Sequence, residues 1–172
     1  WNNNGYLQLD GVDDWVNLGQ MSFASNQVTL EATIVPDEIK SGEVCIVGNP
    51  ESGGVELYLN NGKPAFTVYI KEKNTYYSVT ASNVLNVGKK VSLKGTYDGK
   101  DVCVYVNGVL ADKSTIEGTI GVPQNNTVMA IGCNPYGNSY VGQYAYFFKG
   151  KIYSVNIYDK ALTKSEIALL GK

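Results

Sequence analysis

Asp-Gly and Asn-Gly dipeptides between alternating apolar and polar residues constrain the fold of this chain most strongly. In residues 95–110, GTYDGKDVCVYVNGVL, Asp98-Gly99 and Asn107-Gly108 lie nine residues apart. Gly, Asn and Asp readily adopt the positive φ values of a two-residue hairpin turn, so both dipeptides predict type I′ turns between antiparallel strands. In the segment between them, DVCVYV, both faces are apolar, which predicts a central strand covered on both sides.

Similar short segments follow one another along most of the chain, with turn signals between them and without intervening helical patterns. They read GYLQLD, DWVNL, VTLEATIV, EVCIVG, VELYLN, PAFTVYI, TYYSVTA, KVSLKGTY, VLADKST, TVMAIG and KGKIYSVNIYD. Strands in this arrangement predict an all-β sandwich or barrel, in a single domain spanning residues 1–172. One short C-terminal helix is expected after Thr163, which can cap it together with Glu166 three residues later.

Composition excludes several classes of function. The chain has no His, which removes the commonest general base and the commonest metal ligand. All 14 basic residues are scattered Lys and the net charge is −2, so nucleic-acid binding is not expected. No apolar run approaches the roughly 18 residues that a membrane-spanning helix needs, so membrane insertion is not expected either.

The three cysteines, Cys45, Cys103 and Cys133, lie in or beside apolar strands and lack metal-ligand spacing. We favour the interpretation that they are small buried apolar side chains. One disulfide between two of them, with a third free thiol, stays open as an alternative.

Four segments resemble one family, the laminin-G-like jelly rolls of the concanavalin A-like lectin/glucanase superfamily. In order along nearly the whole chain they are YLQLDGVDDWVNL, VTLEATIVP, GTYDGKDVCVYVNGVL and FKGKIYSVNIYDKALTKSEI. The resemblance implies a two-sheet antiparallel jelly-roll sandwich. It also implies a module of a larger secreted or cell-surface protein, of a kind that often binds carbohydrate.

The resemblance also bears on calcium. In related folds a carboxylate on the closing strand helps to hold a structural calcium ion near the N-terminal strand, but here Tyr153 stands at that position and cannot replace a carboxylate ligand. Asp10, Asp13 and Asp14 could still bind an ion, although Asp residues around a Gly more often satisfy their own turn. We therefore expect no required cofactor, and structural calcium stays an alternative.

Glucanases of the same superfamily use clustered acids on one strand, since glycoside hydrolysis needs two carboxyl groups on either side of the scissile bond. In this chain the acids are isolated, as in Glu31, Glu56, Glu72 and Glu117. Glu31 and Glu56 could share a face across strands, and Glu31 is kept as a candidate ligand-binding residue. We expect the domain itself to be non-catalytic, whereas the parent protein can be a glycoside hydrolase or another secreted enzyme.

Residues 133–149, CNPYGNSYVGQYAYFFK, are unusually aromatic for a loop. A sugar site needs exposed aromatic rings for the apolar face of the sugar and polar side chains for its hydroxyl groups. The candidate binding residues that combine these features are Tyr136, Asn138, Tyr140, Gln143, Tyr144 and Tyr146, with Tyr76, Tyr77 and Glu31 elsewhere in the chain. Strand alternation would expose only one of Tyr76 and Tyr77, and packing of the tyrosines against the sandwich is the alternative to binding.

These features together predict a non-catalytic, lectin-like carbohydrate-binding module. We expect a monomeric domain of an extracellular or cell-surface protein, in a bacterium, with a glycan or polysaccharide as partner. The alternative is a structural or protein-binding adhesion module without a sugar site. The sequence does not distinguish binding on the concave face of a sheet from binding by the loops at its rim.

Overall fold

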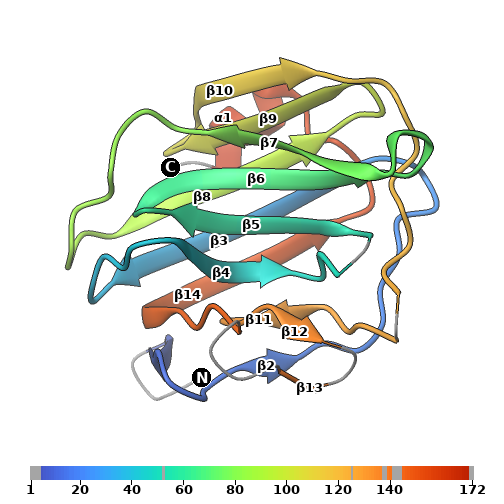
Figure 1. Ribbon diagram of the computed structural model, residues 1–172. Coiled ribbons are helices and arrows are strands. Elements are labelled where there is room, and N and C mark those ends of the chain that lie inside the picture. Colours follow the sequence, from blue (N-terminus) through green and yellow to red (C-terminus); the bar gives the residue numbers. More distant parts are fainter. Residues whose placement is uncertain (1–4, 52, 125, 137–138, 141–144, 171–172) are drawn as a thin grey trace.

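The protein is a sandwich of two six-stranded antiparallel sheets (Figure 1). The computed structural model describes residues 5–170 except 52, 125, 137–138 and 141–144. The rear sheet contains, in spatial order, β1 (Leu7–Asp10), β14 (Lys149–Tyr158), β3 (Val28–Pro36), β8 (Val91–Tyr97), β9 (Asp101–Val106) and β10 (Val109–Thr115). The front sheet contains, in spatial order, β2 (Val16–Asn17), β11 (Ala130–Ile131), β4 (Glu43–Gly48), β5 (Val55–Asn60), β6 (Lys63–Ile70) and β7 (Thr75–Thr80). The all-β, two-sheet prediction is confirmed.

Three small elements complete the fold. They are a ribbon of β12 (Pro135–Tyr136) and β13 (Ser139–Tyr140), the 3-10 helix η1 (Lys71–Lys73) and the helix α1 (Lys164–Leu170). The predicted cap of α1 is confirmed, because the backbone N–H of Thr163 donates to the Glu166 carboxylate at 2.7 Å and the N–H of Glu166 donates to the Thr163 hydroxyl at 3.3 Å. Over the part of the chain that the structure describes, no helix is long and apolar enough to cross a membrane.

The two predicted hairpins around β9 are both present, but their turns differ. Asn107 and Gly108 have φ values of 50° and 76°, as the predicted type I′ turn requires. At the other hairpin only Gly99 has a positive φ, of 94°. There the Asp98 carboxylate accepts backbone hydrogen bonds from the N–H groups two and three residues later, at 3.0 and 2.7 Å. The type I′ prediction was wrong at this turn, because the side chain of Asp98 stabilises a four-residue loop, residues 98–101, between the paired Tyr97 and Val102.

The hydrophobic core lies between the two sheets. Alternate side chains of β5, namely Val55, Leu57 and Leu59, point into it, and Phe66 of β6 lies beside them. A Cβ atom on Gly95 of β8 would lie 2.1 Å from the Phe66 ring, so the glycine lets this ring approach the backbone of the rear sheet. Each residue between these alternate positions therefore faces outward from the sandwich.

The outer face of the rear sheet is partly covered by the C-terminal region. Cys103 and Tyr105 of β9 pack there against Leu162 and Ile167, which confirms the prediction of a central strand covered on both sides. Figure 1 shows α1 behind the rear sheet, on the side away from β4, β5 and β6. The described helices thus leave the outer face of the front sheet open.

All three cysteines are free thiols and buried, so the alternative of one disulfide is not realised. Burial raises the pKa of the Cys133 thiol to about 12 and the pKa of the Cys45 thiol well above its ordinary value. Because the thiolate is the reactive form, these cysteines are inert packing groups, as the sequence predicted.

Candidate functional site

A polar hollow of about 440 Å³ lies on the outer face of the front sheet, which we call the carboxyl hollow. Strands β4 to β7 form its floor, and two loop segments form its walls. Its lining consists of Glu43, Pro50, Glu51, Glu56, Tyr58, Thr67, Tyr76, Ser78, Asn134 and Tyr146. It brings aromatic rings, one side-chain amide and three carboxyl groups together.

Strand alternation places the floor residues. In β5, VELYLN, the apolar residues face the core, so Glu56 and Tyr58 face the hollow. Gly48 lies opposite Glu56 on β4, and a Cβ atom on Gly48 would come within 2.8 Å of the Cα, Cβ and Cγ atoms of Glu56. The glycine therefore provides the space in which the Glu56 side chain lies.

Backbone hydrogen bonds hold the wall formed by the aromatic loop. The N–H of Asn134 donates to the carbonyl of Ala145 at 2.7 Å, and the N–H of Cys45 on β4 donates to the carbonyl of Tyr146 at 2.8 Å. Tyr146 has a φ of 52°, which is uncommon for a bulky residue and costs conformational energy. These contacts fix the two ends of the loop beside β4 and place Asn134 and Tyr146 in the lining of the hollow.

The acids of the hollow are electrostatically coupled. Glu56 is 2% exposed, and its Oε1 atom has no hydrogen-bond partner among the described residues. Burial raises the pKa of Glu56 well above its ordinary value, and the neighbouring Glu43 carboxylate raises it further. Burial also raises the pKa of Glu43, against a lowering by its hydrogen bond with Glu56. Burial thus favours the neutral form of both carboxyl groups, and more strongly that of Glu56.

Glu51 and Asn134 form the polar edge of the hollow. Burial raises the pKa of Glu51, and a hydrogen bond from the Asn134 side chain opposes this shift. Because the amide nitrogen of Asn134 is the donor to Glu51, its Oδ1 atom points elsewhere, and that buried oxygen has no partner among the described residues.

Tyr76 supplies a ring at the rim. It is 41% exposed, and its hydroxyl group donates to the carbonyl oxygen of Pro50. Its ring meets the ring of Tyr69 edge to face, with centroids 4.9 Å apart. Tyr69 is held in turn by a 2.6 Å hydrogen bond from its hydroxyl to the Asn74 side chain. An exposed ring in a fixed orientation is what stacking against the apolar face of a sugar requires.

Two of the candidate binding residues, Tyr76 and Tyr146, meet in the carboxyl hollow. Tyr77 packs against the core instead, so the prediction that only one of the adjacent tyrosines would be exposed is confirmed. Tyr136 is 47% exposed on β12 but is not part of the lining. The backbone of Tyr140 belongs to β13. The other candidates lie outside the described residues, namely Asn138, Gln143 and Tyr144.

Sequence reasoning missed most of the floor. The residues it did not assign to a site are Glu43, Glu51, Glu56, Tyr58, Thr67 and Ser78, whereas Asn134 lies in the aromatic loop that it identified. One signal was available: within VELYLN, Glu56 interrupts an otherwise apolar strand at an outward position. The pairing of β4, β5 and β6, which brings the acids together, is not visible in the sequence.

Glu31 belongs to a different part of the molecule. It lies on β3 of the rear sheet, so it does not share a face with Glu56 on β5 of the front sheet. Its carboxylate pairs with the Lys94 ammonium group at 2.9 Å and accepts hydrogen bonds from Asn156 at 3.3 Å and Tyr158 at 3.5 Å. The side chains of both ion-pair partners are almost fully buried. The structure thus places Glu31 in a buried ion pair of the rear sheet, whereas the hollow lies on the front sheet.

The three aspartates after β1 do lie close together. One carboxylate oxygen from each of Asp10, Asp13 and Asp14 comes within 4.8 Å of the others, and all three side chains are exposed. The Asp10 carboxylate accepts the N–H of Val12 at 2.8 Å, a contact that lowers its pKa, and the N–H of Asp10 donates to Asp14 at 3.1 Å. The predicted turn role is present, and calcium binding here stays a prediction.

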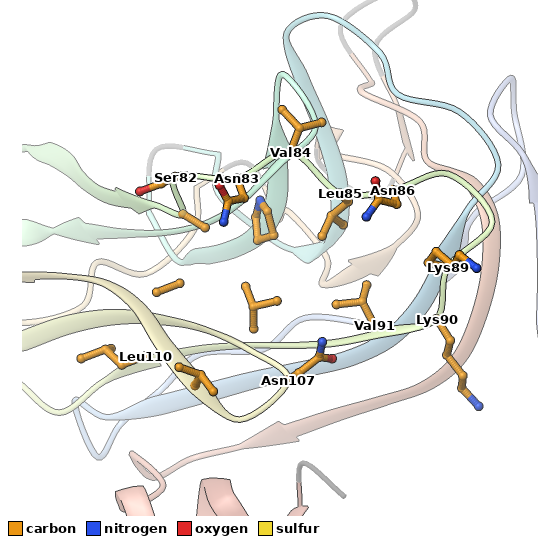
Figure 2. Close-up of a pocket in the computed structure, with 15 residues that line it drawn as sticks. Ser82, Asn83, Val84, Leu85, Asn86, Lys89, Lys90, Val91, Asn107 and Leu110 are labelled. Carbon is orange, nitrogen blue, oxygen red and sulfur yellow. The ribbon is translucent and has the colours of Figure 1, made fainter.

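A second cavity, of about 450 Å³, opens between the sheets near the β9–β10 turn, and we call it the apolar groove. Figure 2 shows Leu85 on one wall and Val91 and Leu110 on the other. Its polar residues are Ser82, Asn83, Asn86, Lys89, Lys90 and Asn107. None of its lining residues is aromatic. Among the described cavities, the carboxyl hollow therefore has the side chains that suit a sugar better.

Two packed antiparallel sheets define a β-sandwich protein. Residues 10–168 match the family model of the concanavalin A-like lectin/glucanases superfamily. The chain therefore belongs to that superfamily, as its four sequence segments predicted.

Solved structures share the fold over nearly the whole chain. Domain 4 of AbnA, a GH43 extracellular arabinanase from Geobacillus stearothermophilus solved with arabinotriose, is 22% identical with a TM-score of 0.75, covering 97% of this chain and 76% of that one. The Ruminococcus gnavus IT-sialidase CBM40, solved with α2,3-sialyllactose, is 16% identical with a TM-score of 0.68, covering 96% and 98%. A mutant of NanB sialidase from Streptococcus pneumoniae is 17% identical with a TM-score of 0.73.

The coverage of these neighbours differs. The match with NanB covers 95% of this chain but only 27% of the NanB chain, so this fold corresponds to one part of that enzyme. A comparison with curated proteins gave no match. At these identities the similarity establishes the fold, and the ligand of this chain has to be argued from its own site.

Proposed function

We propose that this chain is a non-catalytic carbohydrate-binding module of a larger secreted or cell-surface protein, and that the carboxyl hollow is its sugar site. The observation that carries the proposal is the exposed Tyr76 ring beside buried polar atoms of Glu56 and Asn134 in one open hollow. A sugar has an apolar face that stacks on a ring and hydroxyl groups that hydrogen-bond to such atoms.

The structural neighbours support this proposal. The arabinanase domain was solved with arabinotriose and the CBM40 module with sialyllactose. Both ligands are oligosaccharides, and the arabinanase is an extracellular enzyme. A module of this kind would hold its parent protein on a glycan, and weak single sites would gain avidity from repetition or from a linked catalytic domain.

The arrangement of the acids supports a binding role rather than catalysis. Retaining and inverting glycosidases hold two carboxyl groups on either side of the scissile bond, at least about 5 Å apart. Glu43 and Glu56 instead lie within hydrogen-bonding reach of each other, closer together than such a catalytic pair. We expect no hydrolysis of polysaccharides by this domain alone.

A glycan array compared across three proteins tests the proposal. The wild type and Tyr136→Ala should retain the same glycans, because Tyr136 is exposed outside the lining. Tyr76→Ala should lose retention at least about tenfold, because it removes the stacking ring. The two variants are matched, since each removes one exposed tyrosine from the surface.

The outcomes separate the possible sites. Equal retention by wild type and Tyr76→Ala, with loss in Tyr136→Ala, would move the site to the rim loop. No retention of any glycan by the folded wild type would refute carbohydrate binding. Thermal unfolding of each variant shows whether a loss of retention reflects the site or the fold.

The apolar groove favours the second candidate function, a protein-binding module. Its rim exposes apolar side chains, including Val84, Val109 and Leu110, of which Val109 is 69% exposed. Exposed apolar surface with a polar edge is a common feature of protein interfaces. Silence of the glycan array together with loss of partner binding in Val109→Asp would support this candidate.

A further inference from the structure

We infer that the carboxyl hollow selects uncharged glycans, which it binds through their hydroxyl groups, and rejects glycans that present a carboxylate or a sulfate to it. This inference rests on the proposed function and specifies the class of sugar for the same site. Two independent observations carry it, namely the hydrogen-bonding needs of the hollow and its charge.

The hydrogen-bonding needs come from two buried oxygens. Glu56 Oε1 and Asn134 Oδ1 are buried acceptors of the lining without a partner among the described residues. A buried acceptor without a donor is unfavourable, so a ligand that brings donors satisfies both atoms. A sugar hydroxyl group donates, whereas an ionised carboxylate or sulfate only accepts. The hollow is therefore complementary to hydroxyl groups.

The charge of the hollow adds to this preference. Its lining contains Glu43, Glu51 and Glu56 and no Lys or Arg, and the undescribed residues between positions 5 and 170 are uncharged in the sequence. Each of the three carboxyl groups that ionises therefore adds negative charge that no cationic side chain of the lining offsets. An anion brought within a few ångströms of an ionised carboxylate is repelled.

Asn134 strengthens the distinction between donors and acceptors. The amide nitrogen of Asn134 already donates to Glu51. Asn134 therefore offers its oxygen, rather than an N–H group, to a ligand. The hydroxyl groups of Thr67 and Ser78 are also joined, at 2.8 Å between their oxygens. Few donors thus remain for an anionic group, and a glycan carboxylate would lie among acceptors of its own sign.

Matched pairs of oligosaccharides test the inference. One pair is lactose and α2,3-sialyllactose, and another is xylotriose with and without a glucuronic acid branch. To cover other backbones, the array of the previous section carries further neutral glycans with their sulfated forms. For every backbone that is retained, we expect the neutral member to bind at least about tenfold more tightly than the anionic member at neutral pH.

Variants assign this selectivity to the hollow. Glu51→Gln removes one charge from the lining, so the ratio of neutral to anionic binding should fall several-fold. Glu117→Gln removes the same charge from an exposed position outside the lining, and the ratio should stay unchanged. Thermal unfolding confirms that both variants are folded before the ratio is compared.

The outcomes distinguish this inference from the proposed function. Anionic members that bind as tightly as their neutral partners, or a ratio that is equal in wild type and Glu51→Gln, would overturn the inference while leaving carbohydrate binding intact. No retention of any glycan by folded wild type would overturn carbohydrate binding, and the inference with it. Selective retention of neutral members that responds to Glu51→Gln alone would support both.

Discussion

The buried ion pair between Glu31 and Lys94 gives the most quantitative prediction for the scaffold. The two side chains are 6% and 1% exposed, and the Lys94 ammonium group also lies 3.2 Å from the Ser92 hydroxyl. Lys94→Met keeps most of the apolar stem but removes the charge, so the Glu31 carboxylate is left buried with only neutral partners. Removing one member of such a pair costs about 3–5 kcal/mol.

This cost can be converted into a melting temperature. Unfolding entropy near 60 °C is about 2.1 cal/mol/K per residue, which gives about 0.36 kcal/mol/K for 172 residues. Lys94→Met should therefore lower the Tm by about 8–14 °C in scanning calorimetry at pH 7. The double variant Lys94→Met with Glu31→Gln leaves no buried charge, so it should recover most of that loss.

The matched control is Lys113→Met. Lys113 pairs with Asp101 at 2.6 Å, but both side chains are more exposed than those of the buried pair, so water screens the interaction and the Tm should change much less. A Tm of Lys94→Met within about 2 °C of wild type, or a double variant no more stable than Lys94→Met, would refute the reasoning. Glycan retention per folded molecule should be unchanged in these variants.

Two further predictions concern the hollow. Burial raises the pKa values of Glu43 and Glu56 in the folded state above their ordinary value of 4.5, so the folded state binds more protons than the unfolded state. The contribution of this pair to the free energy of unfolding should therefore fall as the pH rises above about 4.5. Glu56→Gln should flatten that dependence in denaturant titrations between pH 5 and pH 8, and a profile parallel to wild type would contradict the raised pKa of Glu56. Gly48→Ala places a methyl group 2.8 Å from three Glu56 carbon atoms, so it should lower stability by about 1–3 kcal/mol in the same titrations, and an unchanged midpoint would contradict this packing.

The strands and the terminal helix were predictable because their signals are local. Period-two alternation in β5 and β9, the Asn107-Gly108 turn and the cap at Thr163 each depend on residues a few positions apart. The Asp98-Gly99 turn shows the limit of such signals. The dipeptide predicted the hairpin, but the hydrogen bonds of the aspartate side chain decided the type of turn.

The site was less predictable because it is made by contacts between distant segments. Tyr76 and Tyr146 were identified as aromatic residues in polar surroundings, but Glu43 and Glu56 lie on strands that only sheet pairing brings together. Glu31 shows the opposite error, in which a local pattern suggests a binding residue that the structure places in an ion pair. As an acidic residue in an alternating strand it resembles Glu56, yet Lys94 on the neighbouring strand β8 makes it an ion-pair partner.

Chemical-shift mapping on the isotope-labelled protein shows whether a sugar binds in the carboxyl hollow. Titration uses arabinotriose or the neutral glycan that the array retains best. If the sugar binds in the hollow, the shifts should saturate and cluster on β4 to β7 around Glu56 and Tyr76, together with Asn134 and Tyr146. Saturating shifts confined to the apolar groove or to the Asp10–Asp14 turn, with the hollow unperturbed, would contradict a sugar site there.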